Sequence, residues 1–260
     1  MTREVIMLSP AAPVSMADEW YAIASPDHFW MEWRFRAIIH NLHKAGKLTP
    51  GTGGRFLEIG CGHGAFIQQL ERDPTIVTDG CDLNLYALQQ IPPVKGNIYV
   101  YDIYKQQSEM LGKYAGVFLL DVIEHIDDDR SFLKAAHDHV QPGGLVVVNV
   151  PALQTLFSKY DTAAGHKRRY TRQSLRAALE ASGLEPLHVG YWGLSLIPIA
   201  VLRKLYLAFV SPDKVIERGF KPPAPVVNML FKVLMKLEMA IFKAPLLGTS
   251  VLAVARKQAK

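Results

Sequence analysis

The sequence has little cysteine and no apolar run near its start, and both absences narrow the kinds of protein it encodes. The two cysteines among the 260 residues are Cys61 and Cys81. Two are too few for a disulfide scaffold, and neither lies in a CxxC pair or beside a run of histidines. Residues 1–13 contain prolines where a secretory signal would have an apolar stretch. We therefore expect a cytoplasmic protein whose cysteines are small core residues.

Acidic residues are scarce in the last quarter of the sequence. Residues 193–260 hold 11 Lys and Arg against three acids, which leaves 18 Lys and Arg against 21 acids for residues 1–192. The net charge of +5 therefore comes from the C-terminal part. This asymmetry indicates either an anionic partner, such as a membrane surface or an acidic substrate, or a solvated basic face.

Apolar residues make up 49% of the chain, and their pattern alternates between the periods of strands and helices. Seven strands are expected, at residues 55–59, 76–82, 97–102, 116–121, 145–150, 187–192 and 249–256. The main helices are expected at residues 32–45, 65–72, 85–90, 128–140 and 171–182. This alternation predicts an α/β fold with a doubly wound, mainly parallel seven-stranded sheet. Such sheets bind ligands at the carboxyl ends of their strands.

A glycine loop directly follows the first of these strands. Its sequence from Glu58 is Glu-Ile-Gly-Cys-Gly-His-Gly, with glycines at positions 60, 62 and 64. The dinucleotide fingerprint has the spacing GxGxxG and brings a helix N-terminus to a pyrophosphate. The spacing here is GxGxG, and an acid two residues before the first glycine suits an ammonium group better than a pyrophosphate. The loop therefore favours an adenosyl amino acid over NAD.

Two further acids end the next two strands. Asp82 lies about 20 residues beyond the loop, where a carboxylate can accept hydrogen bonds from ribose hydroxyls. Asp102 ends the third strand, where it can accept from an adenine amino group, with Ile103 beside the ring. Either acid alone is more often a turn former. Three acids at successive strand ends, counting Glu58, predict a nucleoside site.

Four segments resemble the successive motifs of class I S-adenosylmethionine-dependent methyltransferases, in the small-molecule branch that includes the ubiquinone-type O-methyltransferases. These segments are residues 57–64, 80–83, 120–126 and 133–148. The resemblance implies a Rossmann-like methyltransferase fold with S-adenosylmethionine as cofactor. It assigns the methionine part to Glu58, Gly60, Gly62 and Gly64, the ribose to Asp82, the adenine to Asp102, and the sulfonium end to Asp121. Leu83 and Ile103 complete the expected cofactor site.

Two histidines are the candidate catalytic residues. An oxygen or nitrogen acceptor that must lose a proton needs a base near neutral pKa. His125 follows the fourth strand, and His166 lies in the loop after the fifth strand. The alternative for His125 is a helix-start residue bonded to its neighbour. The adjacent Lys167, Arg168 and Arg169 are either a clamp for an anionic acceptor or a solvated basic turn.

A divalent metal is an open alternative at the same place. Some ubiquinone-type and small-RNA methyltransferases hold a metal on an ExxEH pattern. Here Asp121, Glu124 and His125 resemble that pattern, and His166 could be a further ligand. The first position is Asp rather than Glu, and many members without metal have a similar EH pair. We therefore assign no metal ligands.

The flanking segments are expected to cover the core domain of residues 55–192. Residues 1–54 form a helical lid, with Trp20, Tyr21, His28, Phe29, Trp30 and Trp33 as an aromatic cover or, for Trp33, as core packing. Residues 193–248 form a helical insertion before the last strand and tail at 249–260. Its two helices, 194–210 and 226–243, have central charges that oppose bilayer spanning.

The insertion has a wide apolar face and a stripe of Asn228, Lys232, Lys236 and Lys243. This pattern suits peripheral contact with the inner face of a membrane, a lid over an apolar acceptor, a homodimer interface or packing within the chain.

Together these features predict methyl transfer from S-adenosylmethionine to a hydroxyl of a small-molecule, lipid-linked or glycan-precursor acceptor. An NAD-dependent oxidoreductase and a non-catalytic membrane-associated protein with the same fold are the alternatives. The Asn-Pro-Pro-aromatic motif for a flipped base is absent, so no nucleic-acid partner is expected.

Overall fold

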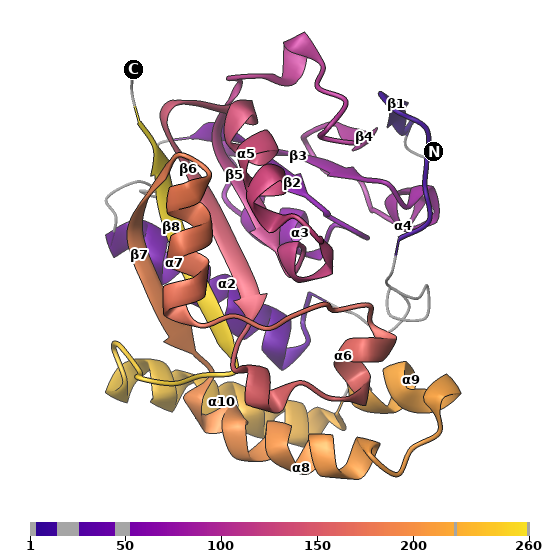
Figure 1. The fold of residues 1–260 in the computed structure, drawn as a ribbon, viewed down its shortest axis with the longest axis vertical. Coiled ribbons are helices and arrows are strands. Elements are labelled where there is room, and N and C mark those ends of the chain that lie inside the picture. Colours follow the sequence, from indigo (N-terminus) through magenta and orange to yellow (C-terminus); the bar gives the residue numbers. More distant parts are fainter. Residues whose placement is uncertain (1–3, 15–25, 45–52, 221–222, 259–260) are drawn as a thin grey trace.

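The computed structural model of the protein describes residues 4–14, 26–44, 53–220 and 223–258. Its sheet has the strand order β1-β4-β3-β2-β5-β6-β8-β7, and only β8 runs antiparallel to its neighbours. The strands are β1 (Ile6–Met7), β2 (Gly54–Ile59), β3 (Ile76–Asp82), β4 (Ile98–Val100), β5 (Tyr114–Leu120), β6 (Val140–Pro151), β7 (Leu184–Trp192) and β8 (Ser250–Lys257). Figure 1 shows β6 and β7 running toward the end of the molecule that holds the insertion, whereas β8 runs away from it.

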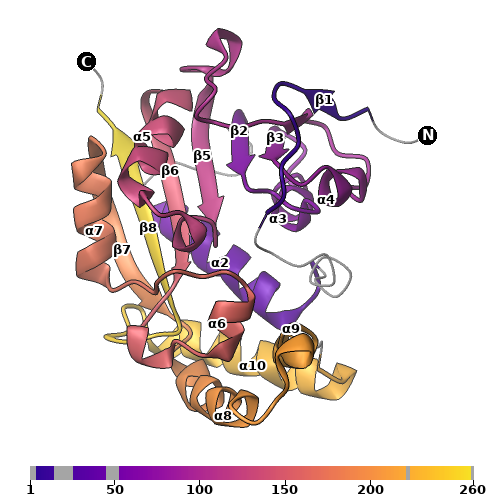
Figure 2. The same cartoon turned by 45° about the vertical axis from the view of Figure 1, so that its right-hand side comes forward.

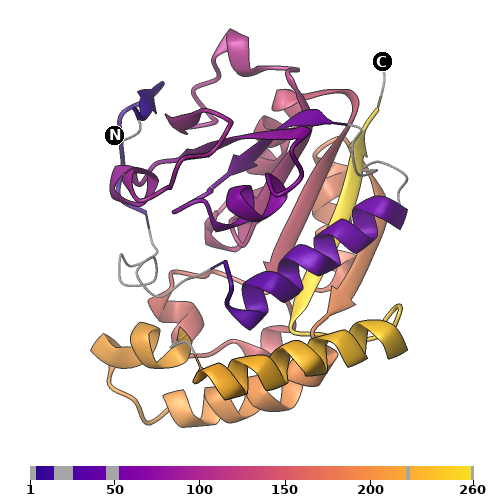
Figure 3. The ribbon, with the colours of Figure 1, turned by 180° about the vertical axis from the view of Figure 1, so that it is seen from behind.

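Helices cover both faces of this sheet because alternate strand residues point to opposite sides. On β5, Val117 and Leu119 belong to the core under α5 (Asp129–His139) and α7 (Arg172–Ala181). Phe118 and Leu120 belong to the opposite core, under α2 (Phe29–Lys44) and α3 (Ala65–Leu70). Figure 3 shows α2 crossing the rear face of the sheet. The doubly wound, mainly parallel fold predicted from the sequence is therefore confirmed.

The expected number of seven strands is wrong, because the described part of the chain has eight. The additional strand is β1, whose Ile6 pairs in parallel with Tyr99 of β4 at the edge of the sheet. Two residues are too short for a periodic hydrophobic pattern, and both of their side chains are exposed. The strand forms because the edge of β4 offers free backbone groups.

The insertion lies between two strands that are neighbours in the sheet, as expected. It contains α8 (Ile197–Leu207), α9 (Val215–Phe220) and α10 (Pro225–Ile241), and β7 then pairs antiparallel with β8. The expected helix at 194–210 is divided, because the 3-10 turn Leu194–Leu196 precedes α8. The buried Glu238 of α10 holds this turn by accepting the backbone N–H groups of Gly193, Leu194 and Ser195.

The other short elements connect the core strands. They are α4 (Leu85–Gln89), α6 (Lys159–Ala163) and the 3-10 turns Ser108–Met110, Ile123–His125, Gln154–Leu156 and Pro212–Lys214. Figure 2 shows α6 beside α8 and α9, where the loop after β6 meets the insertion. Helices α6 and α9 were not predicted from the sequence, because five or six residues give too little helical periodicity.

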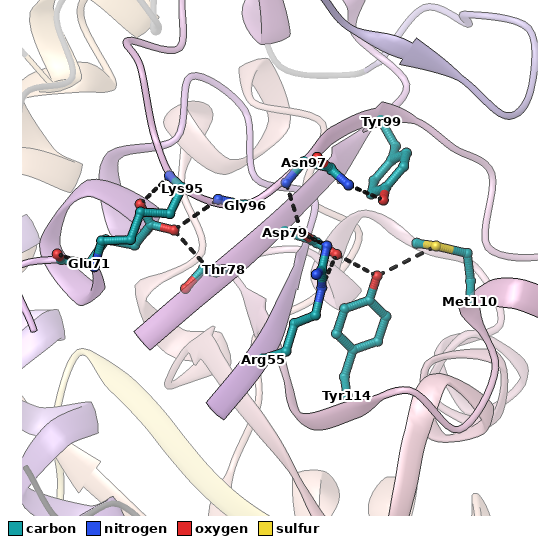
Figure 4. A network of polar contacts seen from close by, with 10 residues as sticks. All are labelled: Arg55, Glu71, Thr78, Asp79, Lys95, Gly96, Asn97, Tyr99, Met110 and Tyr114. Carbon is teal, nitrogen blue, oxygen red and sulfur yellow. Dashed lines mark hydrogen bonds and ion pairs between the residues drawn. The ribbon is translucent and has the colours of Figure 1, made fainter. Parts of the chain in front are cut away.

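A buried carboxylate joins the three central strands. Asp79 of β3 accepts two hydrogen bonds from Arg55 of β2, both of 2.9 Å, and one of 2.9 Å from the Tyr114 hydroxyl of β5. The backbone N–H of Asn97 donates a fourth, of 2.8 Å. Figure 4 shows these groups converging on Asp79. The hydrogen bonds with Asp79 raise the pKa of Arg55, so its guanidinium stays charged.

A second carboxylate in Figure 4 fixes the connection that enters β4. Glu71 follows α3 and accepts the backbone N–H groups of Thr78, Lys95 and Gly96 at 2.9, 2.7 and 3.2 Å. Side chains as well as the backbone hydrogen bonds between strands thus hold the edge of the sheet that is expected to bind the nucleoside.

Removing the Asp79 carboxylate should destabilise the fold. We expect Asp79→Ala to lower the free energy of unfolding by about 3 kcal/mol, because Arg55 and the buried Tyr114 hydroxyl lose their partner. Urea denaturation followed by circular dichroism measures this change. The exposed Glu217→Ala is the control, and a loss below about 1 kcal/mol in Asp79→Ala would contradict the role of the network.

Candidate active site

The glycine loop begins where β2 ends and finishes where α3 starts. Gly60, Gly62 and Gly64 have positive φ values of 72°, 52° and 75°, which favour glycine over residues with a side chain. At Gly60 an added Cβ would also lie 2.6 Å from a methyl carbon of Val122. The loop therefore brings bare backbone to the carboxyl end of the sheet.

A cavity of about 730 Å³ lies beside this loop. Eight of the nine predicted cofactor residues line it, namely Glu58, Gly60, Gly62, Asp82, Leu83, Asp102, Ile103 and Asp121. Gly64 is not part of the wall, because it is the N-cap of α3 and its α-carbon faces Ile91. Both predicted catalytic histidines, His125 and His166, line the same cavity.

Glu58 is a buried carboxyl group with an unused hydrogen-bond acceptor. Its Oε2 atom has no hydrogen-bond partner within the described residues. Burial, opposed by Arg34 and helped by Asp82, raises its pKa to about 8. A buried acid with a free oxygen on the cavity wall is suited to an ammonium group, which would supply the missing donor and charge.

Asp82 and Asp102 both form turns while they face the cavity. Asp82 accepts the backbone N–H of Gly62 and of Asn84, each at 2.9 Å. Asp102 accepts the N–H of Tyr104 at 3.0 Å. A carboxylate has about four acceptor positions, so each can still accept from a ligand hydroxyl or amino group. The turn-forming interpretation and the ligand-binding interpretation are therefore compatible.

Asp121 has a strained backbone and two side-chain partners. Its φ is +60°, which is uncommon for a residue with a side chain. Its carboxylate accepts Arg34 Nη1 at 2.7 Å and Asn149 Nδ2 at 2.9 Å, and Asn149 in turn accepts the indole N–H of Trp192. Burial raises the pKa of Asp121, whereas the Arg34 charge opposes the shift. The ion pair thus stabilises an ionised Asp121 at the end of β5.

The first turns of α2 form part of the cavity wall. His28, Phe29, Trp30 and Arg34 line the cavity, whereas Trp33 is fully buried in the core between α2 and the sheet. Trp20 and Tyr21 of the expected aromatic cover lie outside the described residues. Arg34 was not predicted from the sequence, because nothing in its helical position distinguishes it from a surface arginine.

His166 is held by a carboxylate that the sequence analysis did not identify. Its Nδ1 lies 2.9 Å from Asp161 Oδ1, and the same carboxylate forms an ion pair with Arg169. Burial would raise the pKa of Asp161, but hydrogen bonds from His166 and Arg169 outweigh it and keep the pKa well below its usual range. Asp161 therefore accepts a hydrogen from Nδ1, which leaves Nε2 of a neutral His166 as the basic atom.

His125 lies against His166 and is a weaker base. The two rings meet edge to face with centroids 4.8 Å apart. Burial, together with the nearby His166 and Lys167, lowers the pKa of His125 to about 4. His125 is therefore neutral at pH 7 and has little affinity for a proton.

The structure brings three of the four discussed metal ligands together. One ligand atom each from Glu124, His125 and His166 lies within 4.8 Å of the others. Both carboxylate oxygens of the buried Glu124 lack a hydrogen-bond partner among the described residues, and burial raises its pKa well above the usual value. One carboxylate and two imidazoles suit a divalent transition metal. Asp121 is outside this group, and its carboxylate accepts hydrogen bonds from Arg34 and Asn149 instead.

The basic loop at 167–169 is largely neutralised by the protein itself. Lys167 pairs with Asp127, Arg168 with Asp129 and Arg169 with Asp161. The cavity has another cation in Arg203 of α8, which forms no ion pair with any described carboxylate. Its Nη1 donates to the Gly219 carbonyl at 3.1 Å, and its guanidinium lies 4.8 Å from the Tyr160 ring centroid. Burial lowers the pKa of Arg203, and Tyr160 and Asp161 oppose this shift only in part.

Comparison with known proteins decides which family has this loop and these strand-end acids. The methyltransferase domain family matches residues 30–189, which is more than half of the chain. The chain belongs to this methyltransferase family. S-adenosylmethionine is accordingly its cofactor, and the NAD alternative is set aside.

Relatives of this methyltransferase agree with the assignment. The ubiquinone biosynthesis O-methyltransferase of Escherichia coli O6:H1 is 29% identical over 136 residues, which cover 47% of this chain and 55% of that protein. The chain therefore spans about half the length of the curated relatives it matches.

Two solved structures share the fold. The phosphoethanolamine N-methyltransferase 2 of Haemonchus contortus, in complex with S-adenosylmethionine, has a TM-score of 0.55 and 17% identity, over 85% of this chain and 52% of that one. A SAM-dependent methyltransferase of Archaeoglobus fulgidus has a TM-score of 0.51 and 18% identity, over 88% and 99%.

Cofactor binding should release a proton at pH 7. Glu58, with a pKa of about 8, is mostly protonated in the free protein, and the ammonium of a bound amino acid favours the carboxylate. Titration calorimetry with S-adenosylhomocysteine, in buffers of different ionisation enthalpy, measures the released proton. We expect the release to decline as the pH rises through 8, because the free carboxyl is then already ionised.

The variant Glu58→Gln should bind without this proton release, and the exposed Glu109→Gln is the control. Equal heats in all buffers with the unmodified protein would show that Glu58 does not contact the ammonium group.

Proposed function

We propose that the protein transfers the methyl group of S-adenosylmethionine to a hydroxyl of a small-molecule or lipid-linked acceptor that carries an anionic group. The carrying observation is His166, which lies on the wall of the same cavity as the glycine loop and is held from behind by the buried Asp161. A hydroxyl must lose a proton during methylation, whereas a neutral amine can attack first and lose its proton later. The name of the E. coli relative, an O-methyltransferase, supports the same acceptor atom.

The cofactor, when bound, supplies an electrophilic methyl group on a sulfonium, and the protein's task is alignment and proton removal. Glu58 binds the ammonium, and Asp82 accepts hydrogen bonds from the ribose. The ion pair of Arg34 with Asp121 keeps the end of β5 rigid beside the reacting centre. His166 Nε2 takes the proton of the acceptor hydroxyl, and Asp161 stabilises the imidazolium that forms.

Arg203 is the proposed contact for the anionic group of the acceptor. A guanidinium on the cavity wall without a carboxylate partner can form a paired hydrogen bond with a carboxylate or a phosphate. Ile199 and Ala200 of the same helix and Phe231 of α10 supply apolar wall beside it. The acceptor therefore combines a charged group with an apolar portion.

A metal-assisted form of the same reaction is the second candidate, and the two unpartnered oxygens of Glu124 favour it. Glu124, His125 and His166 would hold the ion, which when bound would lower the pKa of an acceptor hydroxyl.

The base role predicts a defect in turnover without a defect in cofactor binding. We expect His166→Asn to lower kcat by at least about a hundredfold, because the acceptor proton loses its base. Formation of S-adenosylhomocysteine from S-adenosylmethionine, with 3,4-dihydroxybenzoate as the methyl acceptor, measures turnover. Calorimetry should give unchanged affinity for S-adenosylhomocysteine. The control is His137→Asn, which lies outside the cavity wall.

Two outcomes would change this proposal. Loss of activity on chelation, restored by Mn²⁺ or Mg²⁺, would replace the base role of His166 with the metal-assisted form. Methylation of 3,4-diaminobenzoate in place of the dihydroxy compound would exclude a hydroxyl acceptor.

The role of Arg203 predicts a change in acceptor selectivity. We expect Arg203→Gln to raise KM for 3,4-dihydroxybenzoate about tenfold, because a charge-assisted pair is lost. The KM for 4-methylcatechol, which has no carboxylate, should be unchanged. Equal effects on the KM of both acceptors would indicate that Arg203 only supports the local structure. The matched control on the same insertion is Arg218→Gln.

A further inference from the structure

The insertion has an unusual concentration of apolar side chains at the protein surface. Of the 22 large hydrophobic residues that are exposed among the described residues, 16 lie between residues 199 and 247. Scattered exposed hydrophobic residues need no explanation, but a contiguous group marks an interaction site. The insertion therefore has an apolar surface that is suited to binding another molecule or a membrane.

The apolar side chains of α10 form one stripe. Their spacing of four, three, four and four residues places them on the same side of the helix. They are Val226, Leu230, Val233, Leu237 and Ile241, and Leu237 is 54% exposed. Three polar residues of α10, Asn228, Lys232 and Glu238, face inward instead, whereas Lys236 is exposed. Asn228 accepts the backbone N–H of Phe29, and Lys232 pairs with Glu32 of α2.

Helix α8 has the same inverted arrangement. Leu202 and Leu205 of α8 are 66% and 59% exposed, and Phe209, just beyond its end, is 92% exposed. Its two charged residues lie on the inner side, since Arg203 lines the cavity and Lys204 donates to the Thr155 carbonyl. Helices of a water-soluble surface have the opposite polarity. Figures 1 and 3 show α8 and α10 together at the end of the molecule beyond the carboxyl ends of the strands.

We propose that this outer apolar surface, formed by Leu202, Leu205, Phe209 and the five residues of the α10 stripe, docks on an anionic lipid membrane. Lys214, Lys236 and Lys243 belong to the same insertion and form no ion pair with a described carboxylate. Lysines beside an apolar face suit an interfacial helix, because their ammonium groups reach lipid phosphates while the apolar side chains enter the acyl boundary. None of the described helices combines the length and apolar character that crossing a membrane requires.

Charge distinguishes a lipid surface from a second copy of the chain. Residues 193–248 contain eight Lys and Arg against three acids. In a two-fold dimer the same face would meet itself and bring these cations together, which is unfavourable. An anionic membrane instead offers complementary charge along with an apolar interior.

Docking would place the acceptor end of the cavity next to lipid. Ala200 and Arg203 of α8 and Phe231 of α10 line the cavity, while the opposite sides of these helices form the outer apolar surface. One layer of helices thus separates the cavity from the membrane. The inference does not rest on the proposed methyl acceptor, because vesicle binding is measured without methyl transfer.

The test is flotation of the full chain with lipid vesicles. We expect binding to phosphatidylcholine vesicles that contain about one-third phosphatidylglycerol, and much weaker binding to phosphatidylcholine alone. The double variant Leu230→Gln with Leu237→Gln should reduce binding at least about tenfold, because two apolar side chains no longer enter the acyl boundary. The double variant Lys236→Gln with Lys243→Gln should reduce the difference between the two kinds of vesicle.

The matched control removes two exposed apolar side chains elsewhere, with Tyr86→Gln and Leu187→Gln, and should bind like the unmodified protein. Calorimetry with S-adenosylhomocysteine verifies that each variant is folded. The proposal is overturned if the unmodified protein floats with neither vesicle, or if the Leu230 and Leu237 variant floats equally well. A dimer by light scattering that this variant dissociates, without flotation of either protein, would assign the surface to contact between copies.

Discussion

The ion pair between Arg34 and Asp121 is the contact on which the shape of the cavity depends. It joins the N-terminal helix α2 to the end of β5, and Asn149 and Trp192 extend it to β6 and β7. An ion pair with little exposure to water is stable only while both charged groups remain in place, because a buried charge without its partner raises the free energy of the folded state. The helix that closes the cavity and the strands that form its floor therefore keep one relative position.

Much of the core could be predicted from the sequence, because the information was local. The glycine spacing, Glu58 before it, and the acids at the ends of successive strands all lie within short segments whose strand and helix periods agree. The structure accordingly brings Glu58, Asp82, Asp102 and Asp121 to one cavity. The exception is Gly64, whose glycine is explained by the start of α3 rather than by the cavity wall.

The remaining site residues could not be predicted, because their roles depend on distant partners. Arg34 has the sequence context of an ordinary helix arginine, and Asp161 lies in a loop with several polar residues. Asn149 is the exception that could have been noticed, because it is a lone amide inside the apolar strand β6. The insertion illustrates the same limit. Its sequence gave amphipathic helices, but the side that faces inward follows from contacts with α2 and the cavity, such as Lys232 with Glu32.

The position of β8 has a consequence for the order of folding. This strand lies between β6 and β7, although it follows both of them and the whole insertion in the chain. During synthesis β7 has no partner strand until residues 250–257 leave the ribosome, so the sheet closes only after the insertion has been made. The apolar helices α8 and α10 thus emerge while the edge of β6 is still unpaired. The nascent chain then exposes both an open strand edge and an apolar helix surface, and each of them can associate with other chains.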